Sequence, residues 1–297
     1  MRTANVFAAG CVLTALAGVI AAQQAQPDSE ADLRLGKQVY ARACLECHGS
    51  EGHGDGPKAL RLGFHPRKLS LGSFKCRCTG SGDLPTDDDL YRVVTRGMSG
   101  TPMQPFEKSL SEAERRAVVR YLKTLTTRFA SSPPPSCIRL APSPILSTAQ
   151  SISEGEQVYR VLECWKCHGK TGRGDGPVTA GLKDDWGNPI RAYDFTVMKR
   201  LKCGVEDIDI YRTLLTGMNG SPMPSYAKSF LFGREGTTDP SVYQSEFNAA
   251  ELKELQDYLS RQPAAAAINA MAPEGRENLE NRRAWSLVYY LKSLVVH

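Results

Sequence analysis

The sequence predicts two helical domains that follow one another along the chain. Four short motifs recur in the same order 120 residues further on, and one register shared by several motifs indicates a duplicated domain. Amphipathic helix patterns precede and close each copy, with Gly- and Pro-rich loops between them. A chain of 297 residues is long enough for two such domains, each with a core of its own.

The N-terminus is typical of an export signal. Arg2 supplies a positive charge, residues 6–22 form an uncharged apolar run, and Ala21 and Ala22 suit a signal peptidase. We therefore expect residues 1–22 to be a cleaved signal peptide and the mature protein to be periplasmic. The run also approaches the length of a membrane span, so an uncleaved membrane anchor is the alternative.

The first copy of the repeat belongs to a predicted domain of residues 23–130. A short helix pattern, Gly36–Tyr40, precedes the sequence Cys44–His48, which reads Cys-Leu-Glu-Cys-His. The closing helix begins after Ser111, which forms a capping-box pattern with Glu114 and leads into an apolar stripe.

A Pro-rich linker, residues 131–151, leads to the second predicted domain, residues 152–297. Prolines exclude a helix in the linker, and its scattered apolar residues predict that it packs along the domains. The motif returns as Cys-Trp-Lys-Cys-His at Cys164–His168, but the closing helix pattern appears only near Trp285. We therefore expect an insertion in this domain, around residues 230–275.

Each copy carries the Cys-x-x-Cys-His signature of covalent haem c attachment. The two thiols add across the haem vinyl groups, and the following histidine reaches the iron. A zinc site is the competing interpretation, but it needs further Cys or His ligands at a spacing that neither copy offers. The prediction is two haem c groups, attached through Cys44, Cys47, Cys164 and Cys167 and ligated by His48 and His168.

The remaining iron ligand is predicted to be methionine in both domains. Histidine is scarce, and the second copy has none between His168 and the C-terminal residue. A Gly-x-x-Gly-x-Pro-Met loop ends at Met103 and at Met223, each 55 residues past its histidine. We predict these two as ligands, with Met98 and Met218 as packing residues. Met/His ligation raises the haem potential.

Together these motifs resemble the class I cytochrome c family in its tandem diheme form, over residues 33–125 and 152–294. The resemblance implies an all-α fold in which each domain is a small helical bundle around one covalent haem c. It also implies that the first and last helices of each domain cross at right angles. The crossings would put Gly36 and Tyr40 on Tyr121 and Leu122, and Gly155 and Tyr159 on Tyr290 and Leu291.

Three further residues have open roles at this point. Arg67 and Arg191 are candidates for reaching haem propionates, with solvated surface charge as the equal alternative. Trp165, inside the second motif, is expected either to shield the second haem or to contact the neighbouring domain.

Four cysteines fall outside the family pattern, namely Cys76, Cys78, Cys137 and Cys203. A bond between the first two would be strained because they are so close in sequence. Bonds from Cys137 or Cys203 to one of that pair would tie the linker or the second domain to the first. The sequence leaves the connectivity open.

The sequence thus predicts an electron carrier or electron-transfer subunit rather than an enzyme. Two His/Met-ligated haems leave no open iron position, and no acid–base cluster accompanies them. The alternative is a diheme redox enzyme, peroxidase-like or thiosulfate dehydrogenase-like, because Cys76, Cys78 or Cys203 offers a thiolate ligand.

The expected partners are redox proteins, such as a dehydrogenase, reductase or oxidase complex. A net charge of +5 without a basic cluster interleaved with aromatics gives no indication of nucleic-acid binding. A membrane is expected as a partner only if the N-terminal segment stays uncleaved.

Overall fold

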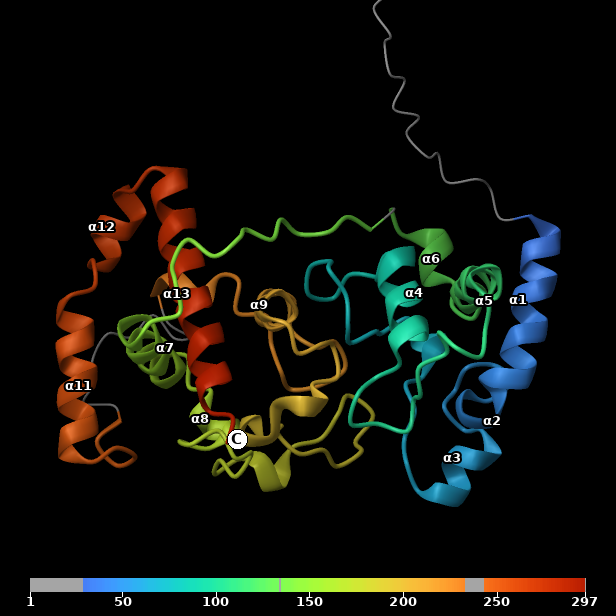
Figure 1. The fold of residues 1–297 in the computed structure, drawn as a ribbon, viewed down its shortest axis with the longest axis horizontal. Coiled ribbons are helices and arrows are strands. Elements are labelled where there is room, and N and C mark those ends of the chain that lie inside the picture. The colour runs from blue at the N-terminus through green and yellow to red at the C-terminus, as the bar shows by residue number, and fades with distance from the viewer. Residues whose placement is uncertain (1–28, 134, 233–242, 297) are drawn as a thin grey trace, which may run out of the picture.

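A computed structural model of the chain describes residues 29–133, 135–232 and 243–296. These residues form two helical domains side by side and contain no β-strand, which confirms the predicted all-α fold (Figure 1). No helix in the described ranges is long and apolar enough to cross a membrane. The predicted signal peptide, residues 1–22, lies outside the described residues.

The helices of the two domains follow the same order. The first domain contains α1 (Glu30–Ala43), α2 (Leu45–His48), α3 (Pro57–Leu62), the 3-10 turn η1 (Leu69–Leu71), α4 (Asp87–Arg96), α5 (Glu112–Thr124) and α6 (Arg128–Ser131). The second contains α7 (Ala149–Val161), α8 (Trp165–His168), η2 (Thr179–Gly181), η3 (Phe195–Arg200), α9 (Asp207–Thr216), α10 (Ser229–Phe232), α11 (Ala249–Ser260), α12 (Ala265–Ala270) and α13 (Pro273–Ser293).

In each domain the first helix crosses the last one at a glycine. Figure 1 shows α1 lengthwise beside α5 seen end-on, and α13 lengthwise beside α7 seen end-on. A Cβ on Gly36 would overlap the carbonyl oxygen of Ala117, so only glycine permits this approach. The rings of Tyr40 and Tyr121 then lie 5.3 Å apart, centre to centre, which confirms the predicted packing.

The same crossing recurs in the second domain. A Cβ on Gly155 would overlap the carbonyl oxygen of Ser286, and the rings of Tyr159 and Tyr290 also lie 5.3 Å apart. The predicted capping box at the start of α5 is present as well, since the Ser111 hydroxyl accepts from Glu114 N at 3.2 Å.

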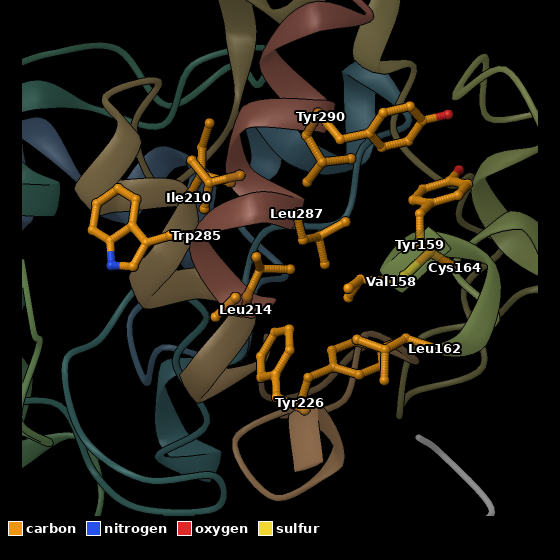
Figure 2. Packing of buried hydrophobic residues seen from close by; sticks show 14 of the residues in the cluster. Val158, Tyr159, Leu162, Cys164, Ile210, Leu214, Tyr226, Trp285, Leu287 and Tyr290 are labelled. Atoms are coloured by element: carbon orange, nitrogen blue, oxygen red, sulfur yellow. The ribbon is translucent and has the colours of Figure 1, made fainter. Parts of the chain in front are cut away.

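Each domain has its own hydrophobic core, and the second core is the larger. Figure 2 shows Val158, Leu214 and Leu287 of this core pointing toward one another from α7, α9 and α13. The core extends to Leu255 and Tyr258 of α11, which lies within the predicted insertion. The part of the insertion from residue 243 onward therefore packs as part of the domain, whereas its residues 233–242 lie outside the described residues.

The linker runs across the top of the molecule in Figure 1 and lies against the second domain. Its apolar side chains Ile138, Leu140 and Ile145 pack on the second core. Tyr289 donates to the carbonyl of Ile145 at 3.1 Å, and Trp285 donates to that of Ala141 at 3.2 Å. The linker is thus fixed along the protein, as its apolar residues predicted.

Two disulfides connect the segments. Cys78 is bonded to Cys137 of the linker, with 4.7 Å between the Cα atoms. Cys76 is bonded to Cys203, just before α9 in the second domain, with 5.2 Å between the Cα atoms. The first domain is therefore covalently joined to both the linker and the second domain.

Candidate haem sites

One helical turn presents the attachment residues in each domain. The amide of His48 donates to the carbonyl of Cys44 at 2.9 Å, and the amide of His168 donates to that of Cys164 at 2.9 Å. Cys44 and Cys47 therefore lie on the same short turn as the histidine. The spacing seen in the sequence therefore places the two cysteines and the histidine close together, in the same way in both domains.

The state of the cysteines fits covalent haem attachment. The four motif cysteines, Cys44, Cys47, Cys164 and Cys167, are not in disulfides, whereas the other four described cysteines pair with one another. Burial raises the pKa of the Cys44 thiol to about 12. Among the described residues no three Cys, His, Asp or Glu side chains gather to hold a metal ion.

The hydrogen bonds of both histidines orient them for iron. Nδ1 of His48 lies 3.3 Å from the carbonyl oxygen of Arg67, and Nδ1 of His168 lies 2.9 Å from that of Tyr193. A carbonyl only accepts, so Nδ1 carries the proton and Nε2 keeps its lone pair for the metal. Burial lowers the pKa of both rings, which favours the neutral, ligating form.

The chain turns back over each histidine in the same way. After His48, Gly49 adopts φ 77°, and the amide of Gly54 donates to the His48 carbonyl at 2.9 Å. The hydroxyl of Tyr40 donates to the Gly49 carbonyl at 2.7 Å, which ties this turn to α1. A Cβ on Gly49 would overlap the Asp55 carboxylate, so Asp55 braces the turn.

The second histidine has matching contacts. Gly174 N donates to the carbonyl of His168 at 2.8 Å, and Tyr159 donates to that of Gly169 at 2.6 Å. The His168 ring also stacks on Phe195, with the ring centres 4.4 Å apart. Both proximal sides are thus built by equivalent backbone contacts.

Each predicted methionine ligand ends a loop that is closed by a backbone hydrogen bond. Met98 N donates to the carbonyl of Met103 at 3.0 Å, and Met218 N donates to that of Met223 at 3.0 Å. Met223 also packs on the core of the second domain. Because the loop brings both methionines of a copy to its two ends, the choice between them stays a prediction.

Comparison with known proteins assigns the family. The family model "Cytochrome C oxidase, cbb3-type, subunit III" matches residues 31–122, and the model "Cytochrome c" matches residues 152–295. Cytochrome c-554(547) of Halothiobacillus neapolitanus is 32% identical over 96 residues, which are 32% of this chain and 97% of that protein. The chain is a diheme class I c-type cytochrome. It therefore binds two haem c groups covalently.

The cytochrome also resembles a solved structure over most of its length. A chain of the reducing HAO-like protein complex Kustc0457/Kustc0458 of Kuenenia stuttgartiensis is 34% identical, with a TM-score of 0.68. The match covers 88% of the cytochrome and 96% of that chain. The tandem arrangement of the two domains is therefore shared with that protein.

Two expectations about single residues change with the structure. Trp165 is 2% exposed and meets Phe247 of its own domain edge-on at 5.3 Å, so the predicted contact with the neighbouring domain is wrong. Arg67 lies over the Trp186 ring at 4.3 Å and donates to the carbonyl of Gly220 at 3.4 Å, so it is no free surface charge. Arg191 is exposed.

One buried cation of the cytochrome escaped the sequence analysis. Arg77 is 1% exposed and donates to the carbonyls of Thr216 and Gly217 in the second domain. It lies between the two disulfide-bonded residues Cys76 and Cys78. In sequence the segment reads as a charged loop, and nothing local signals that it is buried.

Proposed function

We propose that the cytochrome carries electrons between redox proteins of the periplasm, through two haems with His/Met ligation. The observation that carries the proposal is the duplicated geometry of a carbonyl-oriented histidine and a closed methionine loop in each domain. The attachment residues in this proposal are Cys44, Cys47, Cys164 and Cys167, and the iron ligands are His48, Met103, His168 and Met223.

When bound, each haem supplies a one-electron iron couple, and methionine ligation favours a high potential. The chain's part is to keep both ligands in place and to hold water away. Tyr40 and Tyr159 fix the turn after each histidine, and the buried Val39 and Val158 make the surroundings apolar. A rigid, apolar ligand shell lets an electron pass with little rearrangement.

The disulfides support the carrier over the enzyme alternative. A thiosulfate dehydrogenase-like site needs a cysteine thiolate on the iron, yet Cys76, Cys78 and Cys203 are each bonded to another sulfur. The similarity to a chain of an HAO-like complex favours an electron-transfer subunit, with a redox enzyme as its partner.

The same bonds support the proposed compartment. Disulfides persist in oxidising compartments such as the bacterial periplasm. With the N-terminal segment as an export signal, we place the mature cytochrome there. The division into residues 23–130, a linker of 131–151 and residues 152–297 belongs to this proposal.

Methionine substitutions test the ligand assignment. A ferric haem with a thioether ligand has a weak far-red absorption band, to which both domains contribute equally in this proposal. We expect Met103→Ala and Met223→Ala each to remove one contribution, and the double variant to remove the band.

Met98→Ala and Met218→Ala are the matched controls, because these residues lie at the other end of the same loops. They are expected to leave the band intact. A band that disappears with the control substitutions instead would assign the other methionine of each copy. Turnover of peroxide or thiosulfate by the unmodified protein would favour the enzyme alternative.

A further inference from the structure

A side chain of the first domain is hydrogen-bonded to the start of the methionine loop in the second domain. Nη2 of Arg77 donates to the carbonyl of Thr216 at 2.7 Å, and Nη1 donates to that of Gly217 at 3.4 Å. Thr216 ends α9, and Gly217 opens the loop that leads to Met223. The base of that loop is therefore held from across the domain boundary.

The same guanidinium also binds its own domain. Nε donates to the carbonyl of Gly80 at 3.1 Å, and Nη1 approaches the carbonyls of Phe74 and Lys75 at 3.4 Å. A planar fork of five donors is needed to serve carbonyls on two sides at once, and a lysine lacks it. Burial lowers the pKa of Arg77 only to about 10, so the bonds remain charge-assisted at neutral pH.

Further contacts continue along the loop. The amide of Gly82 donates to Asn219 Oδ1 at 3.0 Å, and Asn219 Nδ2 donates to the carbonyl of Asp83 at 3.3 Å. Arg67, whose own carbonyl orients His48, donates to the carbonyl of Gly220 at 3.4 Å. The first domain thus contacts Thr216, at the end of α9, and three residues of the loop, Gly217, Asn219 and Gly220.

Both residues next to Arg77 in the chain are fixed by disulfide bonds. Cys76 is bonded to Cys203, shortly before α9, and Cys78 is bonded to Cys137. One bond therefore ties the segment around Arg77 to the start of the helix whose end Arg77 holds. The backbone on either side of Arg77 is therefore anchored covalently.

The methionine loop of the first domain meets the second domain in a different way. Arg96 and Gly97 of the first domain correspond to Thr216 and Gly217 of the second. Gly97 caps the end of α4, where its amide donates to the Val93 carbonyl, and Gly217 caps the end of α9 in the same way. In the loop after Gly97 the second domain makes a packing contact, since a Cβ on Gly100 would lie 3.0 Å from the carbonyl oxygen of Arg200. The Arg96 side chain is exposed.

We propose that Arg77 is a positioning residue for the second haem: through its hydrogen bonds the first domain keeps the Met223 loop closed, whereas the second domain meets the Met103 loop through packing by Arg200. The inference rests on the proposed function in one respect, namely that Met223 is an iron ligand. Opening the Met223 loop would break two charge-assisted hydrogen bonds from Arg77. The loop is therefore open for a smaller fraction of the time than it would be without Arg77.

Imidazole measures this opening. It binds the iron only after the methionine has left, so its apparent affinity rises in proportion to the open fraction of the loop. In ferric Met103→Ala protein the thioether band reports only Met223, and in Met223→Ala protein it reports only Met103. Imidazole is titrated into each background, with and without Arg77→Lys, until the band is lost.

We expect Arg77→Lys to tighten imidazole binding about tenfold at the second haem, since at least one hydrogen bond to a charged group is lost. Binding at the first haem should stay unchanged. Arg96→Lys, the same exchange at an exposed arginine that ends α4, should alter neither. Cys76→Ser combined with Cys203→Ser should act in the same direction as Arg77→Lys, and it serves as the second variant if Arg77→Lys lowers haem content.

Unchanged imidazole affinity at the second haem, or an equal rise at both haems, would overturn the role of Arg77 alone. Absence of the band in the Met103→Ala parent, before Arg77 is altered, would refute both the Met223 ligation and this inference. The two failures are therefore distinguishable.

Discussion

The carboxyl group of Glu280 on α13 lies where its ionised form is unfavourable. Burial, with Glu277 nearby, raises the pKa of its carboxyl to about 7. In the unfolded chain the group loses its proton near its ordinary value of 4.5. Between these two pH values the folded protein holds a proton that the unfolded chain has released, so stability falls as the pH rises.

We therefore expect Glu280→Gln to stabilise the cytochrome at neutral pH by about 1 kcal/mol, and to change little below the unfolded-state pKa. Thermal unfolding of both proteins across this pH range checks the result. Glu274→Gln, an exposed position on the same helix, is the control. A gain of equal size at acidic and neutral pH would show that side-chain shape, not charge, is responsible.

At the scale of elements, the helix crossings at Gly36 and Gly155 bring two helix backbones into direct contact. A Cβ at Gly155 would overlap the Ser286 carbonyl and lie 2.8 Å from the Tyr290 Cβ. We expect Gly155→Ala, and likewise Gly36→Ala, to lower the unfolding free energy by about 1–3 kcal/mol, because α7 or α1 must move away from its partner.

Denaturant unfolding followed by circular dichroism gives the measurement. Gly275→Ala is the control, since the nearest atom to an added Cβ there is Met271 Cβ at 3.8 Å in an exposed turn of α13. That exchange should be neutral or stabilise by up to about 1 kcal/mol through helix propensity. A loss at Gly275 equal to that at Gly155 would contradict the packing argument.

The helices were predictable because their signals are local, whereas their crossings were predicted from the resemblance to the class I cytochrome c family. The capping pattern of Ser111 and Glu114, the apolar stripe that follows and the repeated Gly-x-x-x-Tyr pattern all act within a few turns. The role of Trp165 was partly mistaken because its neighbour, Phe247, comes from an insertion far along the chain. No periodicity in the sequence reports such a contact.

At the scale of the molecule, the linker is held at both ends. Tyr289 and Trp285 bind it on the second domain, and the Cys78–Cys137 bond holds it on the first. We expect Cys78→Ser combined with Cys137→Ser to cost about 2–4 kcal/mol of stability in the first domain. We also expect faster protease cleavage within the linker.

Limited proteolysis with mass spectrometry locates the cuts, and Ser136→Ala, an exposed neighbour of Cys137, is the control. Cleavage at an unchanged rate would mean that the second domain alone holds the linker.

The docking of the domains was the least predictable property of the sequence. Several pairings of the four extra cysteines satisfy the geometric limits of a disulfide, and the choice depends on how the domains meet. The contact between the domains includes Arg77, which the sequence alone presents as an ordinary surface cation. Its carbonyl acceptors in the second domain are more than 130 residues away in the chain. The haem motifs were readable because each is complete within five residues.

The Cys76–Cys203 bond has a consequence for biogenesis. Its two partners are separated by 127 residues, and both thiols of the second haem motif, Cys164 and Cys167, lie between them in the chain. Because Cys164 and Cys167 precede Cys203 in the chain, Cys76 must stay available until after both of these cofactor thiols have been synthesised. Maturation of this cytochrome therefore requires that oxidation of one set of cysteines and haem ligation of the other be kept apart in time.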